Sequence, residues 1–87
     1  MAYAVTFKAS ATKELGNLSK SISNSVLSKI NALAANPRPN GCAKLKGAGN
    51  MWRIRVGDYR VVYVIDDTRE IVDIRIIAHR GDVYRRL

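Results

Sequence analysis

The spacing of hydrophobic residues changes twice along this chain, and each change predicts a new kind of element. Tyr3, Val5 and Phe7 alternate with small or polar residues, which is the two-residue period of a short strand. The period then lengthens to three and four residues over two stripes separated by a polar break at 19–21. We expect a hairpin of two amphipathic helices, with Ser10 capping the first. The stripes consist of Ala11, Leu15 and Leu18, and of Ile22, Val26, Leu27, Ile30, Leu33 and Ala34.

The two-residue period returns after the segment 36–41, whose prolines cannot continue a helix. Met51–Val56, Tyr59–Ile65 and Glu70–Ala78 each predict a strand, and short polar turns separate them. We therefore expect one α+β domain spanning residues 1–87. Its parts are an N-terminal strand, a two-helix hairpin packed on one face of an antiparallel sheet, and a three-stranded C-terminal meander.

A tight turn at Gly57-Asp58 would fix the register of the meander's first two strands. A two-residue loop places Val56 opposite Tyr59, and therefore Arg55 opposite Arg60. Alternation then assigns one face to a core covered by the helices. That face holds Trp52, Ile54, Val56, Tyr59, Val61, Tyr63, Ile65, Val72, Ile74 and Ile76. The opposite face holds Arg53, Arg55 and Arg60, with Arg75 near Arg60 if the second turn is also tight.

The composition indicates a folded and strongly basic protein. Hydrophobic residues make up 47% of the 87 positions, and the formal net charge is +8. The single cysteine, Cys42, cannot form an internal disulfide, and neither a secretory leader nor an apolar run of roughly 18 residues is visible. We therefore expect a cytoplasmic protein that makes no use of a membrane. The charge suggests nucleic acid as a partner, although a membrane surface or an acidic protein would also be attracted.

The cross-strand arginines suggest which surface would bind an anion. Like charges directly opposite each other destabilise a sheet by about 0.2 to 1 kcal/mol. A phosphate lying across Arg55 and Arg60 would turn this repulsion into attraction, whereas the alternative is a solvated basic face with Asp73 as its counter-charge. Tyr84 suits either stacking on an unpaired base or anchoring the C-terminus, and a lone histidine such as His79 is often structural.

Several kinds of chemistry lack the residues that they need. One histidine and one cysteine cannot build a structural zinc site, and the sequence has no glycine-rich phosphate loop. Asp66 and Asp67 are typical of a turn, and neither a Ser-His-Asp set nor a carboxylate pair on the basic face is credible. We expect no metal ion and no cofactor, which leaves metal-free phosphoryl chemistry.

Three motifs together resemble the RelE toxin family. They are Lys44-Leu45-Lys46-Gly47, Trp52-Arg53-Ile54-Arg55-Val56-Gly57-Asp58-Tyr59-Arg60-Val61-Val62-Tyr63 and Ala78-His79-Arg80-Gly81-Asp82-Val83-Tyr84. With the strand and helices before them, they span nearly the whole chain. The strand pattern is typical of the wider RelE/ParE superfamily, and the closing motif favours its RNA-cleaving branch.

The resemblance implies the toxin of a type II toxin–antitoxin system. Such a toxin is a ribosome-dependent endonuclease that enters the decoding A site and cuts mRNA without a metal. The RNA's own 2′-hydroxyl attacks, leaving a 2′,3′-cyclic phosphate. By this resemblance Arg60 and Arg80 would hold the scissile phosphate, Arg53 and Arg55 would line the same site, and Tyr84 would stack on a base.

The sequence departs from the best-known RelE enzymes at Arg53 and Arg55, where those enzymes have lysines and one lysine is the proposed general base. Arginine stays protonated and cannot take a proton easily. His79, beside Arg80, is the natural substitute for the base. Contacts with RNA or the ribosome are expected from Lys44, Lys46, Arg85 and Arg86.

The partners implied by the resemblance are an acidic, RelB-like antitoxin, the ribosome and mRNA, and the toxin–antitoxin complex would bind operator DNA through the antitoxin. Two other functions remain open at this point. The first is inhibition of DNA gyrase, as in ParE-like relatives that share the fold. The second is a non-catalytic RNA- or DNA-binding module whose basic sheet only grips phosphates.

Overall fold

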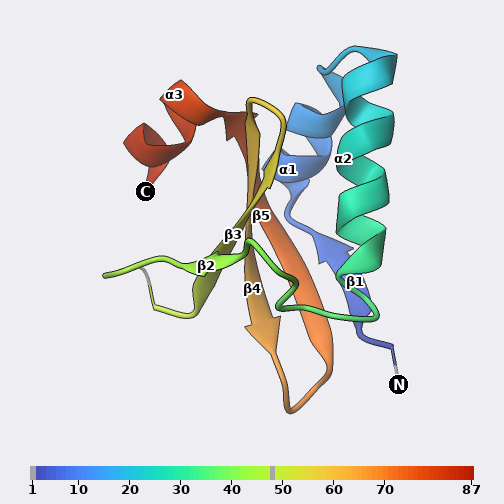
Figure 1. Ribbon diagram of the computed structural model, residues 1–87, viewed down its shortest axis with the longest axis vertical. Coiled ribbons are helices and arrows are strands. Elements are labelled where there is room, and N and C mark those ends of the chain that lie inside the picture. The colour runs from blue at the N-terminus through green and yellow to red at the C-terminus, as the bar shows by residue number, and fades with distance from the viewer. Residues whose placement is uncertain (1, 48) are drawn as a thin grey trace.

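The computed structural model describes residues 2–47 and 49–87, and two helices pack on one face of its five-stranded sheet (Figure 1). The sheet has the order β1-β5-β4-β3-β2. Its strands are β1 (Ala4–Phe7), β2 (Ala43–Lys44), β3 (Met51–Val56), β4 (Tyr59–Asp66) and β5 (Ile71–His79). The helices are α1 (Ala9–Gly16), α2 (Lys20–Ala32) and the short α3 (Arg80–Val83), which continues into a 3-10 turn, η1 (Tyr84–Arg86).

The register predicted for the first hairpin of the meander is confirmed. Val56 pairs with Tyr59 and Arg55 pairs with Arg60. Gly57 has a φ of 59°, in the left-handed region that a tight hairpin turn of this hand requires and that glycine adopts without steric cost. The α+β fold with a helix hairpin on one sheet face is likewise as predicted.

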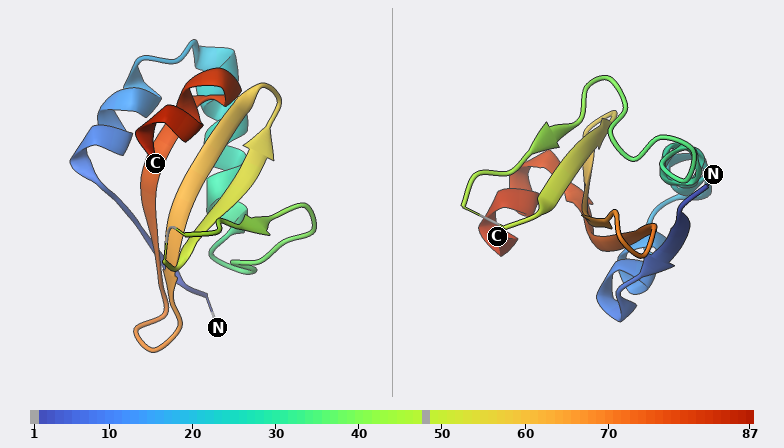
Figure 2. Two further views of the ribbon diagram at one scale, coloured as in Figure 1. Left: turned by 90° about the vertical axis from the view of Figure 1, so that its left-hand side faces the viewer. Right: turned by 90° about the horizontal axis from the view of Figure 1, so that it is seen from below.

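The main core lies between the sheet and the helix hairpin, as the right-hand view of Figure 2 shows. Ala11, Val26, Ile30 and Leu33 supply the helix side of this core. The strands supply Ile54, Val56, Val61, Tyr63, Ile65, Val72, Ile74 and Ile77. We call this side of the sheet the helix face. Because period-two alternation sends the neighbouring side chains the other way, Arg53, Arg55 and Arg60 belong to the second face.

The prediction that Ile76 faces the helices is wrong. The β4–β5 register shifts between Val62 and Tyr63, so that Val62 pairs with Ile76 but Tyr63 pairs with Ile74. This irregularity inserts one extra residue in β5 at Arg75 and reverses the alternation beyond it. Ile76 therefore packs on the second face with Val62, and Ile77 takes its place in the main core.

β1 joins the sheet in parallel with β5, whereas the other strands run antiparallel to their neighbours. The strand-helix-helix start of the chain allows this, since a parallel pair needs a long connection.

Ser10 does not cap α1, because that helix already starts at Ala9 and its N-cap residue is Lys8. Ser19 caps α2 by accepting a hydrogen bond from the Ile22 amide at 3.3 Å. No helix in the described ranges is both long and apolar enough to cross a membrane.

Candidate functional site

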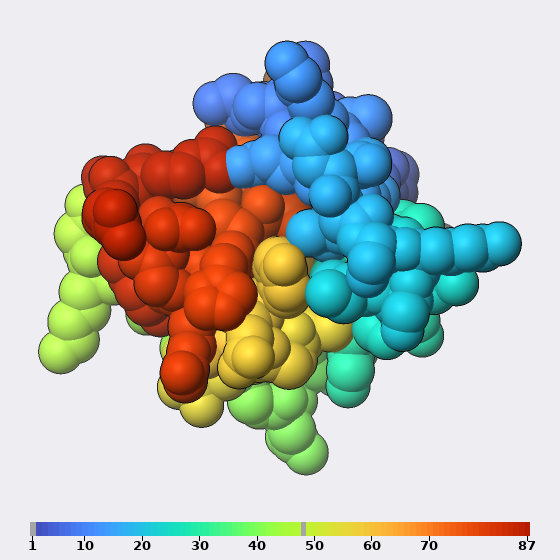
Figure 3. Space-filling view, turned by 90° about the horizontal axis from the view of Figure 1, so that it is seen from above, coloured from blue at the N-terminus to red at the C-terminus, as the bar shows by residue number. Residues whose placement is uncertain are grey.

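The C-terminal segment folds back onto the second face of the sheet. Val83 is fully buried there against Val62 and Ile76. The Arg80 amide donates a hydrogen bond of 2.8 Å to the Asp58 carbonyl, which joins the start of α3 to the β3–β4 turn. Figure 3 shows the result from above, with the C-terminal residues in red beside the hairpin tip in yellow. The sequence motifs around Arg60 and Arg80 are thereby brought to one end of the molecule.

Arg60 and Arg53 are half-buried, and Arg55 is exposed. The Arg60 guanidinium bends back over the turn, where Nη1 donates to the carbonyls of Gly57 and Tyr59, each at 3.0 Å. The Nε of Arg53 is buried and has no hydrogen-bond partner among the described residues. Arg55 lies at the edge of β3 beyond the end of β2 and also borders a hollow of about 250 Å³ beside α2.

Ion pairing divides the nine arginines into two groups. Five of them lie within 4.0 Å of a carboxylate: Arg38 with Asp67, Arg69 with Asp66, Arg75 with Asp73, Arg85 with Asp82 and Arg86 with Glu14. The other four are those that the sequence motifs assign to the site: Arg53, Arg55, Arg60 and Arg80. Within residues 2–47 and 49–87, these four have no carboxylate in ion-pair range.

The expectation that Arg75 lies near Arg60 is wrong. Across the sheet Arg60 faces Ala78, because the β4–β5 turn holds the four residues 67–70 and the extra residue at Arg75 shifts the register by one more position. Arg75 instead places its Nε 2.7 Å from Asp73 Oδ2, an ion pair whose angle falls short of hydrogen-bond geometry. Asp73 therefore acts as the counter-charge of Arg75 alone among the sheet arginines.

His79 lies at the end of β5 opposite Tyr59, on the helix side rather than beside Arg60. Its ring meets the Tyr59 ring edge to face, with centroids 5.6 Å apart. Its Nδ1 accepts a hydrogen bond of 3.3 Å from the Gly81 amide and so caps α3. This geometry is that of a helix cap.

Tyr84 is the most exposed large hydrophobic side chain of the C-terminal turn, with 54% of its surface accessible. Arg85, next to it, pairs with Asp82 at 3.4 Å, and Arg86 pairs with Glu14 of α1. The sequence analysis did not identify Glu14, since nothing in the local pattern links residues 72 positions apart.

The exposed Lys44 and Lys46 lie on β2 and in the turn after it, at the opposite edge of the sheet from β1.

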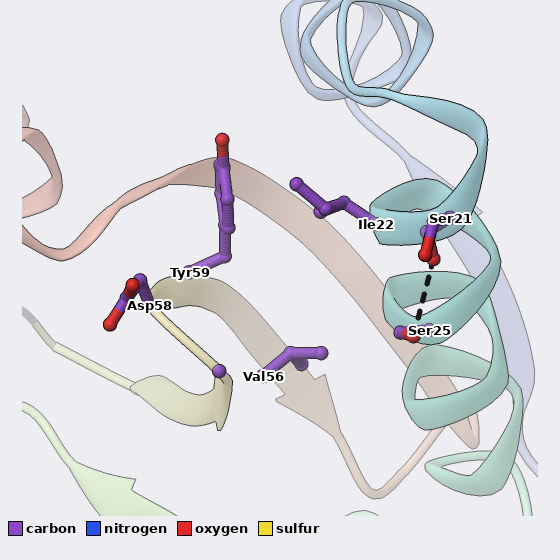
Figure 4. A pocket seen from close by; sticks show the side chains of 7 residues that line it. Ser21, Ile22, Ser25, Val56, Asp58 and Tyr59 are labelled. Carbon is purple, nitrogen blue, oxygen red and sulfur yellow. Dashed lines mark hydrogen bonds between the residues drawn. The ribbon is translucent and has the colours of Figure 1, made fainter.

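A hollow of about 300 Å³ opens on the helix side of the same hairpin (Figure 4). Ile22 of α2 points toward the upright ring of Tyr59 of β4, and Val56 lies below them in this view. Ser21, Ser25, Gly57 and Asp58 complete the lining. The residues that the sequence motifs assign to the site do not line this hollow, so it is separate from the arginine cluster.

The four arginines without a carboxylate partner offer forked, permanently charged donors at one end of the sheet, with an exposed aromatic ring on the adjoining turn. Guanidinium groups bind phosphate oxygens in pairs, and an exposed ring stacks on an unpaired base. Among the described residues, no group of three His, Cys, Asp or Glu side chains is placed to hold a metal ion. The arrangement suits a single-stranded nucleic acid more than a compact small molecule.

Comparison with known proteins places the chain in a family. Residues 5–84 match the family model described as the ParE toxin of the type II toxin-antitoxin system parDE. Toxin RelG of Mycobacterium tuberculosis is 32% identical over 99% of this chain and 100% of its own length. Toxin RelE of the same organism is 34% identical over 95% of this chain and 87% of its own length.

Solved structures of related toxins have the same fold. The RelE chain of the RelE–RelB complex from Pyrococcus horikoshii superposes with a TM-score of 0.82 at 30% identity, covering 93% of this chain and 98% of that one. The M. tuberculosis toxin–antitoxin complex RelBE2 gives 0.81 at 28% identity, covering 92% and 100%. The matches in sequence and in structure agree, and the chain belongs to the RelE family of toxins of type II toxin–antitoxin systems, within the RelE/ParE superfamily.

Proposed function

We propose that this toxin is a ribosome-dependent endonuclease that cleaves mRNA in the decoding A site and thereby stops translation. The attacking group is the 2′-hydroxyl of the mRNA itself, and the products are a 2′,3′-cyclic phosphate and a free 5′-hydroxyl. Neither a metal ion nor a cofactor takes part. The proposal places the toxin in the cytoplasm, where translating ribosomes are.

The observation that carries this proposal is the pairing of the arginines. A guanidinium that a protein uses for stability is normally neutralised, as in Arg38 and Arg86. Arg55 and Arg60 instead face each other across two strands without a carboxylate in ion-pair range among the described residues. An RNA phosphate supplies the missing negative charge.

Arg60 and Arg80 would hold the scissile phosphate and the charge that develops on it, while Arg53 and Arg55 extend the cationic surface along β3. Donors fixed in advance where charge develops are often the largest catalytic contribution, and loss of one costs on the order of a hundred- to a thousandfold. Tyr84 would stack on a base of the mRNA and align its 2′-hydroxyl with the phosphorus.

The proton of the 2′-hydroxyl needs an acceptor, and the geometry favours one outside this chain's histidine. His79 caps α3 through Nδ1 and packs on Tyr59, so its role in the proposal is to hold Arg80 and the following turn in place. The four arginines remain protonated. We propose that solvent or a group of the ribosome accepts the proton, which would also make cleavage depend on the ribosome.

The proposed partner in the resting cell is an acidic antitoxin resembling RelB. Relatives of this chain have been solved as RelE–RelB complexes. The net charge of +8 suits an acidic partner, which would cover the arginine cluster and exclude RNA. The complex would bind operator DNA through the antitoxin, while Lys44 and Lys46 of the free toxin would contact ribosomal RNA.

The deciding experiment maps the 5′ ends of a translated mRNA by primer extension after the purified toxin is added to a translation extract. We expect cuts inside codons occupied by ribosomes, each with a cyclic phosphate upstream, and poor cleavage of the same RNA without ribosomes. Efficient cleavage of naked RNA, or intact mRNA in the extract, would contradict the proposal.

A second candidate function is inhibition of DNA gyrase, since the matching family model is that of ParE. The two functions are separated by a supercoiling assay with the same toxin preparation. A gyrase inhibitor would block supercoiling and leave mRNA intact. The retained Arg60, Arg80 and Tyr84, which the RNA-cleaving branch uses, favour the nuclease.

A further inference from the structure

We infer that Glu14 is a positioning residue that holds the C-terminal turn, and with it Tyr84, against the end of β5. This inference rests on the proposed function only for the role of Tyr84. The contacts themselves are properties of the free toxin. Glu14 lies in the last turn of α1. Its partners among the described residues are Ile77 and Arg86, and of these only Arg86 is an expected RNA or ribosome contact.

The two oxygens of Glu14 bind two different parts of the chain. Oε1 accepts a hydrogen bond of 3.1 Å from the Ile77 amide of β5, and Oε2 forms an ion pair with Nη1 of Arg86 in the C-terminal turn. The carboxylate is mostly shielded, with 21% of the side chain accessible. In Figure 3 the α1 residues in blue meet the C-terminal residues in red, as this bridge requires.

The place of Glu14 in the sheet explains why a carboxylate is useful there. β1 pairs with β5 only as far as Phe7 opposite Ile74, and the last contact is the Lys8 amide with the Ile74 carbonyl. Beyond that point β5 has an open edge, where a partly buried amide without an acceptor would cost about 1 to 3 kcal/mol. Glu14 supplies the acceptor that a longer β1 would have provided.

The C-terminal turn is therefore fixed on both sides of Tyr84. Val83 is buried in the second face before it, and Arg86 is held by Glu14 after it. With both neighbours anchored, the exposed Tyr84 ring projects from a defined point next to Arg80. In this inference Arg86 serves as an anchor of the turn, where the sequence predicted an RNA or ribosome contact.

The substitution Glu14→Gln distinguishes two roles of Arg86, an anchor of the turn and an RNA contact. The two roles predict changes of cleavage activity in different directions. Glutamine keeps an oxygen for the Ile77 amide but loses the ion pair. If Arg86 anchors the turn, kcat for ribosome-dependent cleavage falls by about tenfold or more, because misplacing a stacking group by about 1 Å is costly. KM changes by less than about twofold, since the cationic surface that binds RNA is intact. If Arg86 binds RNA, removing its competitor leaves kcat unchanged or raises kcat/KM, which would overturn the inference.

Two controls exclude a general effect of charge or stability. Glu70→Gln makes the same change in net charge at the far end of β5, and we expect it to cleave as the wild type does. Combining Glu14→Gln with Arg86→Gln removes the pair from both sides, and kcat should fall no further than in either single variant, because the two changes break one interaction. Additive losses in the double variant, together with intact folding by circular dichroism, would count against the ion pair as the cause.

Amide hydrogen exchange of the free toxin tests the bridge independently of any activity. Glu14→Ala should speed exchange at Ile77 and across 84–86 by about tenfold relative to the wild type, whereas Glu14→Gln should speed only the C-terminal turn. Unchanged exchange would refute the inference even if mRNA cleavage is confirmed. A wild type that cuts no mRNA while its variants show these changes would instead refute the proposed function and leave the bridge standing.

Discussion

Arg60 follows the β3–β4 turn and Arg69 lies in the β4–β5 turn, but their guanidinium groups meet different partners. Arg69 lies 3.9 Å from Asp66, whereas Arg60 donates to two uncharged carbonyls of the β3–β4 turn. Carbonyls orient a guanidinium without cancelling its charge. This difference separates an arginine whose charge is neutralised by a neighbouring carboxylate from one whose charge would be available to the phosphate of the proposed function.

Replacing Arg60 with alanine should therefore reduce kcat for ribosome-dependent cleavage by about a hundred- to a thousandfold, because one fixed donor to the developing charge is lost. Arg69→Ala makes the same chemical change at a paired, exposed position and should keep the activity within about twofold, since exposed pairs contribute little. Single-turnover cleavage of mRNA on a stalled ribosome measures both. Equal losses in the two variants would show that net charge alone drives cleavage.

His79 offers a second test at the scale of one side chain. Asparagine also caps helices through its side-chain oxygen, but it cannot take up a proton. If His79 acts as the cap seen in the structure, His79→Asn keeps cleavage within about threefold and His79→Ala loses more, because a lost cap destabilises the turn by about 1 kcal/mol. If His79 is instead the general base, both variants lose about a hundredfold or more and the pH–rate profile changes.

Among the elements, the turn between β4 and β5 shows how distant segments are tied together. Asp67 accepts hydrogen bonds from Tyr3 at 2.6 Å and from two guanidinium nitrogens of Arg38 at 3.2 and 2.9 Å. Arg38 also stacks over the Trp52 ring at 5.0 Å. One carboxylate thus joins the region before β1, the loop after α2 and β3, at the opposite end of the sheet from Arg80.

These contacts make part of the toxin's stability depend on pH. The hydrogen bonds from Arg38 and Tyr3 lower the pKa of Asp67 below its ordinary value of 3.8. A depressed carboxylate pKa stabilises the fold fully above the unfolded value, and this stabilisation is lost as the pH falls through the folded value. Asp67→Asn should therefore lower Tm at pH 7, and its difference from the wild type should shrink as the pH falls below about 3.8. A difference in Tm that persists unchanged in acid would mean that packing, not charge, is responsible.

The elements differ in how far the sequence determines them. β3 was predictable to the residue and β4 to within one residue at its end, because Gly57-Asp58 permits one tight turn and the hydrophobic alternation agrees with it. The β5 bulge was not, since Arg75 and Ile76 fit a regular strand equally well and only the packing of Val83 on the second face rewards the shift. The Glu14–Arg86 bridge was hidden because its two residues lie far apart in the sequence. The bulge also decides the side of His79, because the reversed alternation puts this residue on the helix side with Ile77.

Over the whole molecule, carboxylates lie near the five arginines outside the candidate site. Among the described residues, none lies in ion-pair range of the four arginines of the site. The seven acidic residues include one partner for each of Arg38, Arg69, Arg75, Arg85 and Arg86. The excess charge of +8 therefore falls on the lysines and on the four arginines of the candidate site. In the proposed function, such an arrangement would attract RNA and an acidic antitoxin to the same surface and would make their binding mutually exclusive.

This arrangement predicts how salt affects capture by the antitoxin. Charges separated by more than the Debye length, about 10 Å at 0.1 M and about 3 Å at 1 M ionic strength, no longer steer the encounter. The association rate constant for the cognate antitoxin should thus fall at least about tenfold over that range of salt, while the dissociation rate constant changes by about threefold or less.

Stopped-flow association with the wild type and with a variant combining Arg53→Gln and Arg55→Gln measures the salt dependence of the association rate constant directly. Because the variant removes two cations of β3, a smaller salt dependence would locate part of the steering charge on the arginine surface. An equal dependence would place it on the cations that the variant keeps.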